Sequence, residues 1–105
     1  MISEKLNLGE YGDLIFEKDQ ANGGLRSKLQ LKNGYYLSIV TNFNGSNGFY
    51  GYWEEETFEI SILNKNKVFT FLNEIDDEDY RIDGGIWSHL SVNQILEKIK
   101  IIEKL

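Results

Sequence analysis

The stretch LRSKLQLKNGYYLSIVT, residues 25–41, predicts the centre of the fold. Its first half alternates leucine with charged and polar residues, a pattern typical of a β-strand that buries one face. Asn33-Gly34 follows directly and is a strong signal for a tight turn. The second half, residues 35–41, is rich in aromatic and β-branched residues and predicts the antiparallel partner strand.

The register of this hairpin predicts the length of its loop. A two-residue loop at Asn33-Gly34 would pair Gln30 with Leu37 and set a polar residue against an apolar one. A three-residue loop over residues 32–34 pairs Leu29 with Leu37 and brings the apolar side chains to one face. We therefore predict the three-residue loop, with Gly34 in the left-handed conformation that glycine tolerates best.

The sequence on either side of the hairpin predicts further strands. Residues 57–62 and 68–72 alternate apolar with polar side chains, and residues 14–16 form a weaker strand near the start of the chain. Residues 64–67 are typical of a turn, and residues 73–85 are polar and end in two glycines.

The C-terminal region predicts one α-helix over residues 92–104. Ser91 and Gln94 have the spacing of a capping box, in which each side chain bonds the backbone N–H of the other residue. Apolar residues then recur at helical spacing, with Ile99 near the centre of the stripe. The expected fold class is α+β: a four-stranded antiparallel β-meander with one C-terminal α-helix packed on its apolar face, in a single domain spanning residues 1–105.

The composition excludes several kinds of site. The 105 residues include no cysteine, which rules out a disulfide framework, a thiolate metal site and a cysteine nucleophile. The single histidine, His89, rules out mechanisms that need two imidazoles. We therefore predict no enzymatic activity, no cofactor and no metal site. No apolar run approaches the roughly 20 residues of a membrane span, so we expect no membrane association.

Acidic residues are concentrated in the second half of the chain. Residues 54–83 hold ten of the 17 acids but only three bases, and the formal net charge of the chain is −6. An acidic surface either maintains solubility or meets a basic partner. Direct binding of nucleic acid is disfavoured, because phosphate contacts need a basic stripe. The candidate partner-binding carboxylates are Glu54, Glu55, Glu56, Asp76, Asp77, Glu78 and Asp79.

The aromatic run Phe49-Tyr50-Gly51-Tyr52-Trp53 is the most unusual local feature. It follows a loop rich in asparagine and glycine and directly precedes three glutamates. Tyrosine and tryptophan dominate the energetically important positions of protein interfaces, so Tyr50, Tyr52 and Trp53 are candidate anchoring residues. The alternative is that the run seals one end of the sheet, because a small domain needs its aromatic residues for the core.

Several motifs resemble those of a family of small tailed-phage and prophage accessory proteins. These are Asn33-Gly34-Tyr35 followed by Ser38 and Val40, the strand Thr57–Leu63, and the helix with Val92-Asn93 and Leu96–Lys100. The resemblance spans residues 23–102, and the motifs are structural ones. Tyr36, Ile39, Phe58 and Ser61 depart from the family pattern, as does the longer acidic stretch before the helix. The resemblance implies a phage origin and an accessory role in the bacterial cytoplasm, and carries over no functional residues.

The negative charge, the aromatic run and the resemblance to phage proteins together predict that this protein is an inhibitor. We expect a non-enzymatic phage protein that binds a host protein with a basic surface and blocks a nucleic-acid-dependent defence system, as an anti-CRISPR protein does. Its carboxylates would lie where the phosphates of the nucleic acid otherwise bind.

Two other hypotheses fit the same sequence. An immunity protein that neutralises a competitor's toxin nuclease would use the same acidic surface. A protein that sequesters a small signalling nucleotide would stack an aromatic residue on the base, and Arg26 and Lys28 are the candidate cations for its phosphates.

Overall fold

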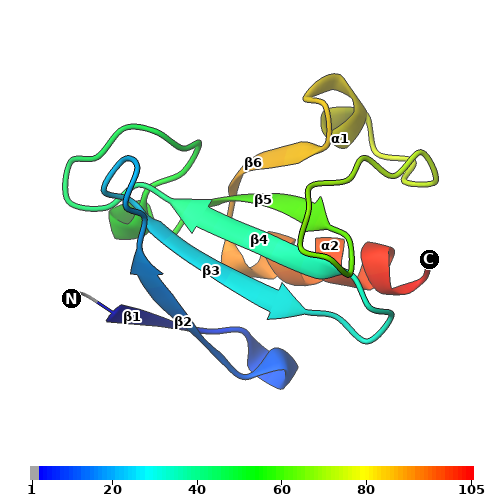
Figure 1. Cartoon of the computed structure of the whole chain (residues 1–105), viewed down its shortest axis with the longest axis horizontal. Coiled ribbons are helices and arrows are strands. Elements are labelled where there is room, and N and C mark those ends of the chain that lie inside the picture. The colour runs from blue at the N-terminus through cyan, green and yellow to red at the C-terminus, as the bar shows by residue number, and fades with distance from the viewer. Residues whose placement is uncertain (1–2) are drawn as a thin grey trace.

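The computed structural model describes residues 3–105, which form one six-stranded antiparallel sheet with its strands in chain order, together with a C-terminal helix (Figure 1). The strands are β1 (Ser3–Asn7), β2 (Asp13–Lys18), β3 (Leu25–Gln30), β4 (Tyr36–Thr41), β5 (Phe58–Leu63) and β6 (Ile86–Leu90). The α-helices are α1 (Glu78–Ile82) and α2 (Val92–Glu103), and short 3₁₀ turns are η1 (Gly9–Tyr11) and η2 (Trp53–Glu55).

The β3–β4 hairpin confirms the predicted three-residue loop. Leu29 lies opposite Leu37. The loop closes where the N–H of Leu31 donates to the carbonyl of Tyr35 at 2.8 Å, and Gly34 has a φ of 93°. Leu37 is fully buried and Leu29 partly so, and the register therefore follows from the need to bury one face.

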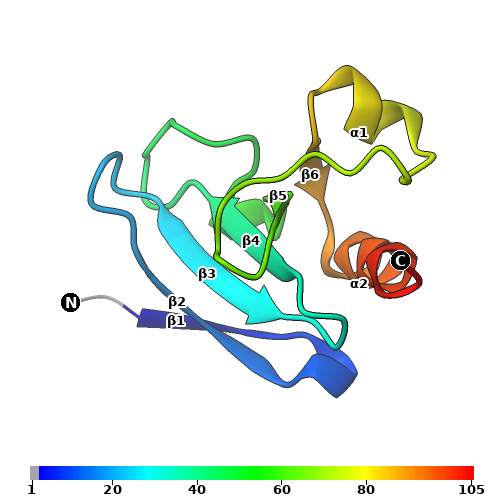
Figure 2. The ribbon, with the colours of Figure 1, turned by 45° about the vertical axis from the view of Figure 1, so that its right-hand side comes forward.

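Helix α2 begins at the predicted cap and covers one face of the sheet (Figure 2). Ser91 and Gln94 form the capping box in both directions. Ile95, Ile99 and Ile102 are fully buried against the sheet, whereas Ile101 is 37% exposed.

The C-terminal end of α2 is tied to two loops of the sheet. The amide of Asn33 donates to the carbonyl of Ile102 at 2.8 Å, and the hydroxyl of Tyr11 donates to Glu103 at 2.6 Å. The hydrogen bond to Glu103 raises the pKa of Tyr11 to about 12.

The predicted number of strands was wrong, since the described residues form six strands and not four. Strand β6 was missed because its buried residues, Trp87 and Leu90, are three positions apart and not two. The register between β5 and β6 shifts between Phe58 and Ile60, and this irregularity breaks the alternation that marks a strand in sequence. Strand β1 is short and pairs with β2 alone. It therefore forms one edge of the sheet, and β6 forms the opposite edge.

The predicted strand at residues 68–72 was also wrong. Within this segment, Phe69 forms an isolated β-bridge with Leu63 of β5. The chain then leaves the sheet, and the ring of Phe71 stacks on Tyr80 of α1. Leu72 is buried, but Phe69 and Phe71 are exposed. None of the helices in residues 3–105 has the length and apolar character needed to cross a membrane.

Candidate protein-binding surface

The two acidic runs of the sequence lie at opposite ends of β5. Residues 54–56 directly precede this strand, whereas residues 76–79 follow it and lead through α1 into β6. Strand β6 runs antiparallel to β5, so α1 stays at the end where β5 finishes. A strand of six residues is about 20 Å long, and the acidic residues therefore form two clusters (Figure 1).

Within residues 76–79, Asp77 differs from its neighbours. Asp76, Glu78 and Asp79 are exposed, but Asp77 caps α1 and accepts the N–H of Tyr80 at 3.1 Å. Its carboxylate also binds the ammonium of Lys98 on α2 at 3.0 Å. Burial opposes ionisation of Asp77, but these two partners outweigh it and hold its pKa below the ordinary value. Asp77 thus joins α1 to α2, while the other three carboxylates face solvent.

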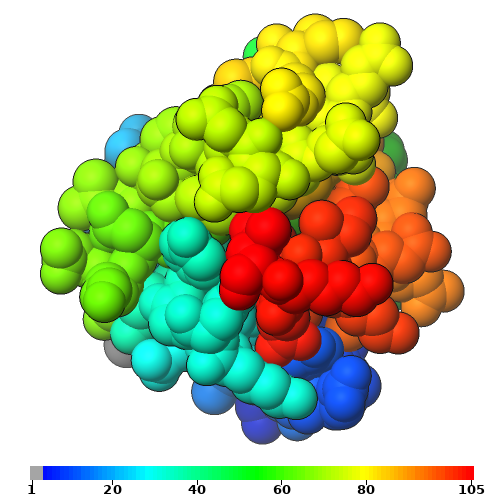
Figure 3. Space-filling view, turned by 90° about the vertical axis from the view of Figure 1, so that its right-hand side faces the viewer, coloured from blue at the N-terminus to red at the C-terminus, as the bar shows by residue number. Residues whose placement is uncertain are grey.

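Exposed apolar side chains lie beside the carboxylates of α1. Phe69 is 48% and Phe71 37% exposed, and both rings lie so close over Gly85 that an added Cβ there would be about 3 Å from each. The ring of Phe71 stacks on Tyr80 with centroids 5.2 Å apart, and Ile82 is 71% exposed. Figure 3 shows residues 64–83, from green-yellow to yellow, as a continuous layer over this end of the molecule. Phe69 and Phe71 could not be recognised as surface residues from the sequence because residues 68–72 have the pattern of a strand, and Ile82 because it lies in the polar stretch 73–85.

The glutamates of residues 54–56 lie near the loop that follows β4. Glu54 turns toward this loop and accepts the N–H of Asn44 at 2.8 Å, which holds the pKa of Glu54 below its ordinary value. Glu55 and Glu56 are exposed, and Glu56 has the left-handed φ of 54°. In this second acidic cluster the carboxylates of Glu55 and Glu56 face solvent, whereas the carboxylate of Glu54 is hydrogen-bonded to the loop.

The aromatic run divides between the core and the surface. Trp53 is half-buried, and its ring packs edge-on against Phe16 and Phe58 with centroids 5.4 and 6.1 Å apart. Tyr50 and Tyr52 are 62% and 37% exposed and lie together, because both rings are within 6.4 Å of the ring of His89 on β6. Trp53 thus contributes to the fold, and the exposed aromatic cluster consists of Tyr50, Tyr52 and His89.

Asn42 holds the loop that carries these tyrosines in a defined shape. Its side-chain oxygen accepts the N–H groups of Gly48 and Phe49 at 2.7 and 3.0 Å. Its amide nitrogen donates to the carbonyls of Phe49 and Gly51 at 2.6 and 2.9 Å. Asn42 is 1% exposed, so water does not compete for these bonds. The loop is therefore a rigid support for Tyr50.

Tyr50 is also fixed to two strands by its backbone. Its N–H donates to a carboxylate oxygen of Glu59 on β5 at 3.0 Å, and its carbonyl accepts the N–H of His89 at 2.9 Å. His89 has a φ of 53°, in the left-handed region that few residues other than glycine adopt.

A groove of about 390 Å³ lies along β6. It is lined by Tyr50, Asp83, Ile86 and Ser88, so it runs from the tyrosine cluster to the end of α1. Ile86 follows Gly85, on which Phe69 and Phe71 pack. We use the term β6 surface for the set Tyr50, Tyr52, Phe69, Phe71, Asp76, Glu78, Asp79, Ile82, Asp83, Ile86, Ser88 and His89.

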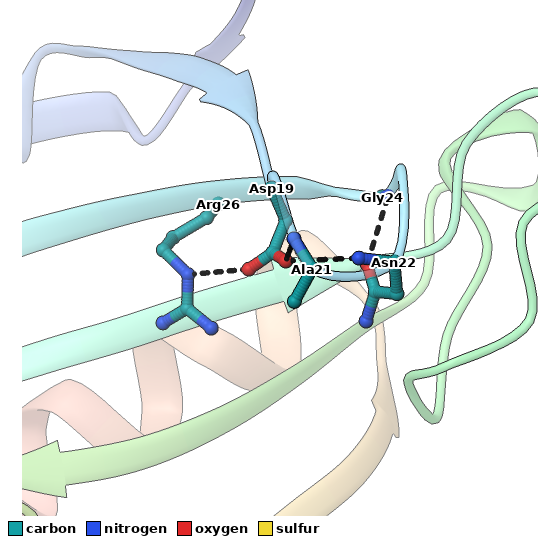
Figure 4. Close-up of polar contacts among 5 residues, drawn as sticks. All are labelled: Asp19, Ala21, Asn22, Gly24 and Arg26. Atoms are coloured by element: carbon teal, nitrogen blue, oxygen red, sulfur yellow. Dashed lines mark hydrogen bonds and ion pairs between the residues drawn. The ribbon is translucent and has the colours of Figure 1, made fainter.

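Arg26, one of the two cations proposed to bind the phosphates of a nucleotide, already forms an ion pair within the chain. The guanidinium of Arg26 binds Asp19 at 2.8 Å (Figure 4). It also lies 5.9 Å from the centre of the ring of Phe49. Burial opposes ionisation of Asp19, but Arg26 and the N–H of Ala21 outweigh it and lower the pKa of Asp19. A phosphate at Arg26 would have to break this pair. Lys28, the other candidate cation, is exposed and forms no ion pair within residues 3–105.

No set of three histidine, aspartate or glutamate side chains within the described residues is arranged to hold a metal ion. Comparison of the chain with models of known families, with curated proteins and with solved structures returned no match. The likeness to phage accessory proteins therefore stays a prediction.

Proposed function

We propose that this chain is a non-enzymatic binding protein that presents its β6 surface to a basic surface of a protein partner. The observation that carries the proposal is the composition of that surface. Exposed tyrosine rings lie at one end of the groove, and exposed phenylalanine rings and carboxylates lie at the α1 end. None of the carboxylates of the β6 surface forms an ion pair among the described residues. Exposed apolar side chains rimmed by like charges are typical of interaction sites.

The two components of the surface have separate roles. The carboxylates of Asp76, Glu78, Asp79 and Asp83 attract a positively charged partner from a distance and raise the rate of association. Tyr50, Tyr52 and Phe69 supply rigid contact area, which slows dissociation once the complex has formed.

The partner class follows from the charge and from the resemblance to phage proteins. Proteins that bind nucleic acid expose basic grooves, and an acidic protein blocks such a groove by placing carboxylates where phosphates bind. We propose that the partner is a bacterial defence protein of this kind, and that the chain acts as a phage-encoded inhibitor in the host cytoplasm.

An affinity capture from bacterial lysate tests the proposal, performed with and without nuclease treatment. We expect the wild-type chain to retain a nucleic-acid-binding protein after nuclease treatment, and that protein to lose affinity for nucleic acid when the chain is added. A variant with Tyr50→Ala and Asp79→Lys serves as the matched bait. Equal capture by both baits, or capture that disappears with nuclease, would contradict the proposal.

A further inference from the structure

We infer that the groove along β6 receives an arginine side chain of the partner. The inference rests on the proposed function, since it supposes a protein partner, and it names the chemistry by which the partner is recognised. The groove offers three kinds of contact over a short distance: a carboxylate at one end, a tyrosine ring at the other, and an apolar side chain between them.

Asp83, the carboxylate that lines the groove, forms no ion pair among the described residues. Asp83 follows α1 and is exposed, and Glu59 accepts the N–H of Tyr50 from the neighbouring strand. The ion pairs within residues 3–105 are Arg26–Asp19 and Lys98–Asp77, so neither Asp83 nor Glu59 takes part in one.

The nearest arginine in the chain is held by other groups. Arg81 lies two residues before Asp83, and its guanidinium donates to the carbonyls of Ile75 and Asn73 at 3.2 and 2.9 Å. These bonds direct its charge toward the segment before α1. The negative charge of Asp83 is therefore available to an external cation.

Tyr50 lies at the other end of the groove and exposes its ring there. Its backbone is held by Glu59 and His89, and its side chain is 62% exposed. A guanidinium stacks on an aromatic ring and binds a carboxylate at the same time, because it is planar and donates from its edges. The ammonium of lysine is compact and cannot do both equally well. Half-buried Ile86 can cover the aliphatic part of the arginine side chain.

Nuclear magnetic resonance of the ¹⁵N-labelled chain tests the inference with three small probes. These are N-acetyl-arginine amide, the corresponding lysine compound, and the citrulline compound, which keeps the shape of arginine but has no charge. We expect the arginine probe to shift the backbone signals of Tyr50, Asp83, Ile86 and Ser88 to saturation. The lysine probe should bind about threefold more weakly, and the citrulline probe should leave these signals unchanged.

Variants locate the two contacts. Asp83→Asn should weaken binding of the arginine probe about fivefold, in the range of exposed ion pairs. Tyr50→Ala should weaken it by a similar factor, whereas Tyr50→Phe should retain it because the ring remains. Glu97→Gln, a matched change at an exposed glutamate of α2, should have no effect. The spectrum of each variant shows directly whether it is folded.

Two results would overturn the inference: equal shifts with citrulline and arginine, or shifts scattered over the acidic surface and unaffected by Asp83→Asn. The probes separate this inference from the proposed function. Binding of the arginine probe without any captured protein would contradict the proposed function alone. Capture of a nucleic-acid-binding protein without any effect of the arginine probe would contradict the arginine site alone.

Discussion

Asp77 and Asp79 stand two positions apart in the acidic run, yet they serve different purposes. Asp77 caps α1 and binds Lys98, and just 17% of its side chain is exposed. Asp79 lies in the first turn of α1, faces solvent and forms no ion pair among the described residues. A run of like charges in a sequence therefore does not reveal which carboxylate supports the fold, because the partner on α2 lies 21 positions away.

Asp77 should make the stability of the protein depend on pH in the acid range. Its pKa is lowered in the folded state, so the unfolded chain takes up the proton first as the pH falls. The contribution of this carboxylate is complete about one pH unit or more above the ordinary pKa of about 3.9 and is lost as the pH falls through the folded-state value. We expect the free energy of unfolding, measured by urea titration, to decrease progressively below about pH 5.

The variant Asp77→Asn isolates this effect, because asparagine can still accept the N–H of Tyr80 as a helix cap. Its free energy of unfolding should be lower than that of wild type at neutral pH and should decrease less in acid. Asp79→Asn is the matched control on the same helix. Parallel pH profiles for wild type and Asp77→Asn would show that the pair with Lys98 contributes no stability.

Substitution of Gly34 should destabilise the protein because of the backbone conformation of this residue alone. Its φ is 93°, and an added Cβ would meet no described heavy atom within 4 Å. Gly34→Val should therefore lower the free energy of unfolding by about 1 kcal/mol or more, since a β-branched residue disfavours this region. Gly34→Asn should be milder, because asparagine tolerates positive φ better. Equal melting temperatures for wild type and Gly34→Val would reject the turn.

At the scale of elements, α2 offers three positions that separate capping from packing. Ser91→Ala removes the cap and should lower the free energy of unfolding by about 1 kcal/mol. Ile99→Ala empties a fully buried position, and the expected loss is about 2–5 kcal/mol.

Ile101 provides the control for this pair, because it carries the same side chain on the same helix and is 37% exposed. Ile101→Ala should therefore cost clearly less than Ile99→Ala when both are measured by urea unfolding. Similar losses of stability for Ile99→Ala and Ile101→Ala would mean that α2 does not pack on the sheet through Ile95, Ile99 and Ile102.

Elements whose signals are local could be predicted from the sequence. The β3–β4 turn follows from Asn33-Gly34, and the start of α2 follows from Ser91 and Gln94. Strand β6 could not be recognised, because the register shift opposite Phe58 and Ile60 hides its alternation. Residues 68–72 have the pattern of a strand, but their phenylalanines pack over Gly85 instead of facing a core.

The candidate surface was predictable in part. The exposure of Tyr50 and Tyr52 agrees with the expected anchoring role, which itself stays a prediction, whereas Trp53 turns toward Phe16 and Phe58. The groove joins Tyr50 to Asp83, 33 positions later, and this proximity results from the hydrogen bonds that hold Tyr50 to Glu59 on β5 and to His89 on β6. No local pattern in the sequence encodes such a contact, and tertiary structure is needed to find it.

The charge of the whole molecule is distributed unevenly along the chain. The acidic segment 54–83 contributes more than the net charge of −6, so the rest of the chain is nearly balanced. Charge on the β6 surface should therefore steer a basic partner toward that side of the molecule. The same number of charges placed elsewhere should have much less influence on the encounter.

The association rate of a charge-reversed variant with the captured partner shows whether the β6 surface steers binding. The variant carries Asp76→Lys, Glu78→Lys and Asp79→Lys and leaves Asp77 intact. The control carries Glu10→Lys, Glu17→Lys and Glu97→Lys, an equal change at exposed glutamates of other elements. Surface plasmon resonance at about 10 and about 150 mM salt, where screening lengths are about 30 and about 8 Å, separates steering from contact.

We expect the β6-surface variant to associate about tenfold more slowly than wild type at low salt, with a smaller difference at physiological salt. The control should keep most of the wild-type association rate, because its charges lie on other elements, η1, β2 and α2. If the β6-surface variant associates as fast as wild type at both salt concentrations, its carboxylates serve only solvation, and the account of an acidic binding surface is contradicted.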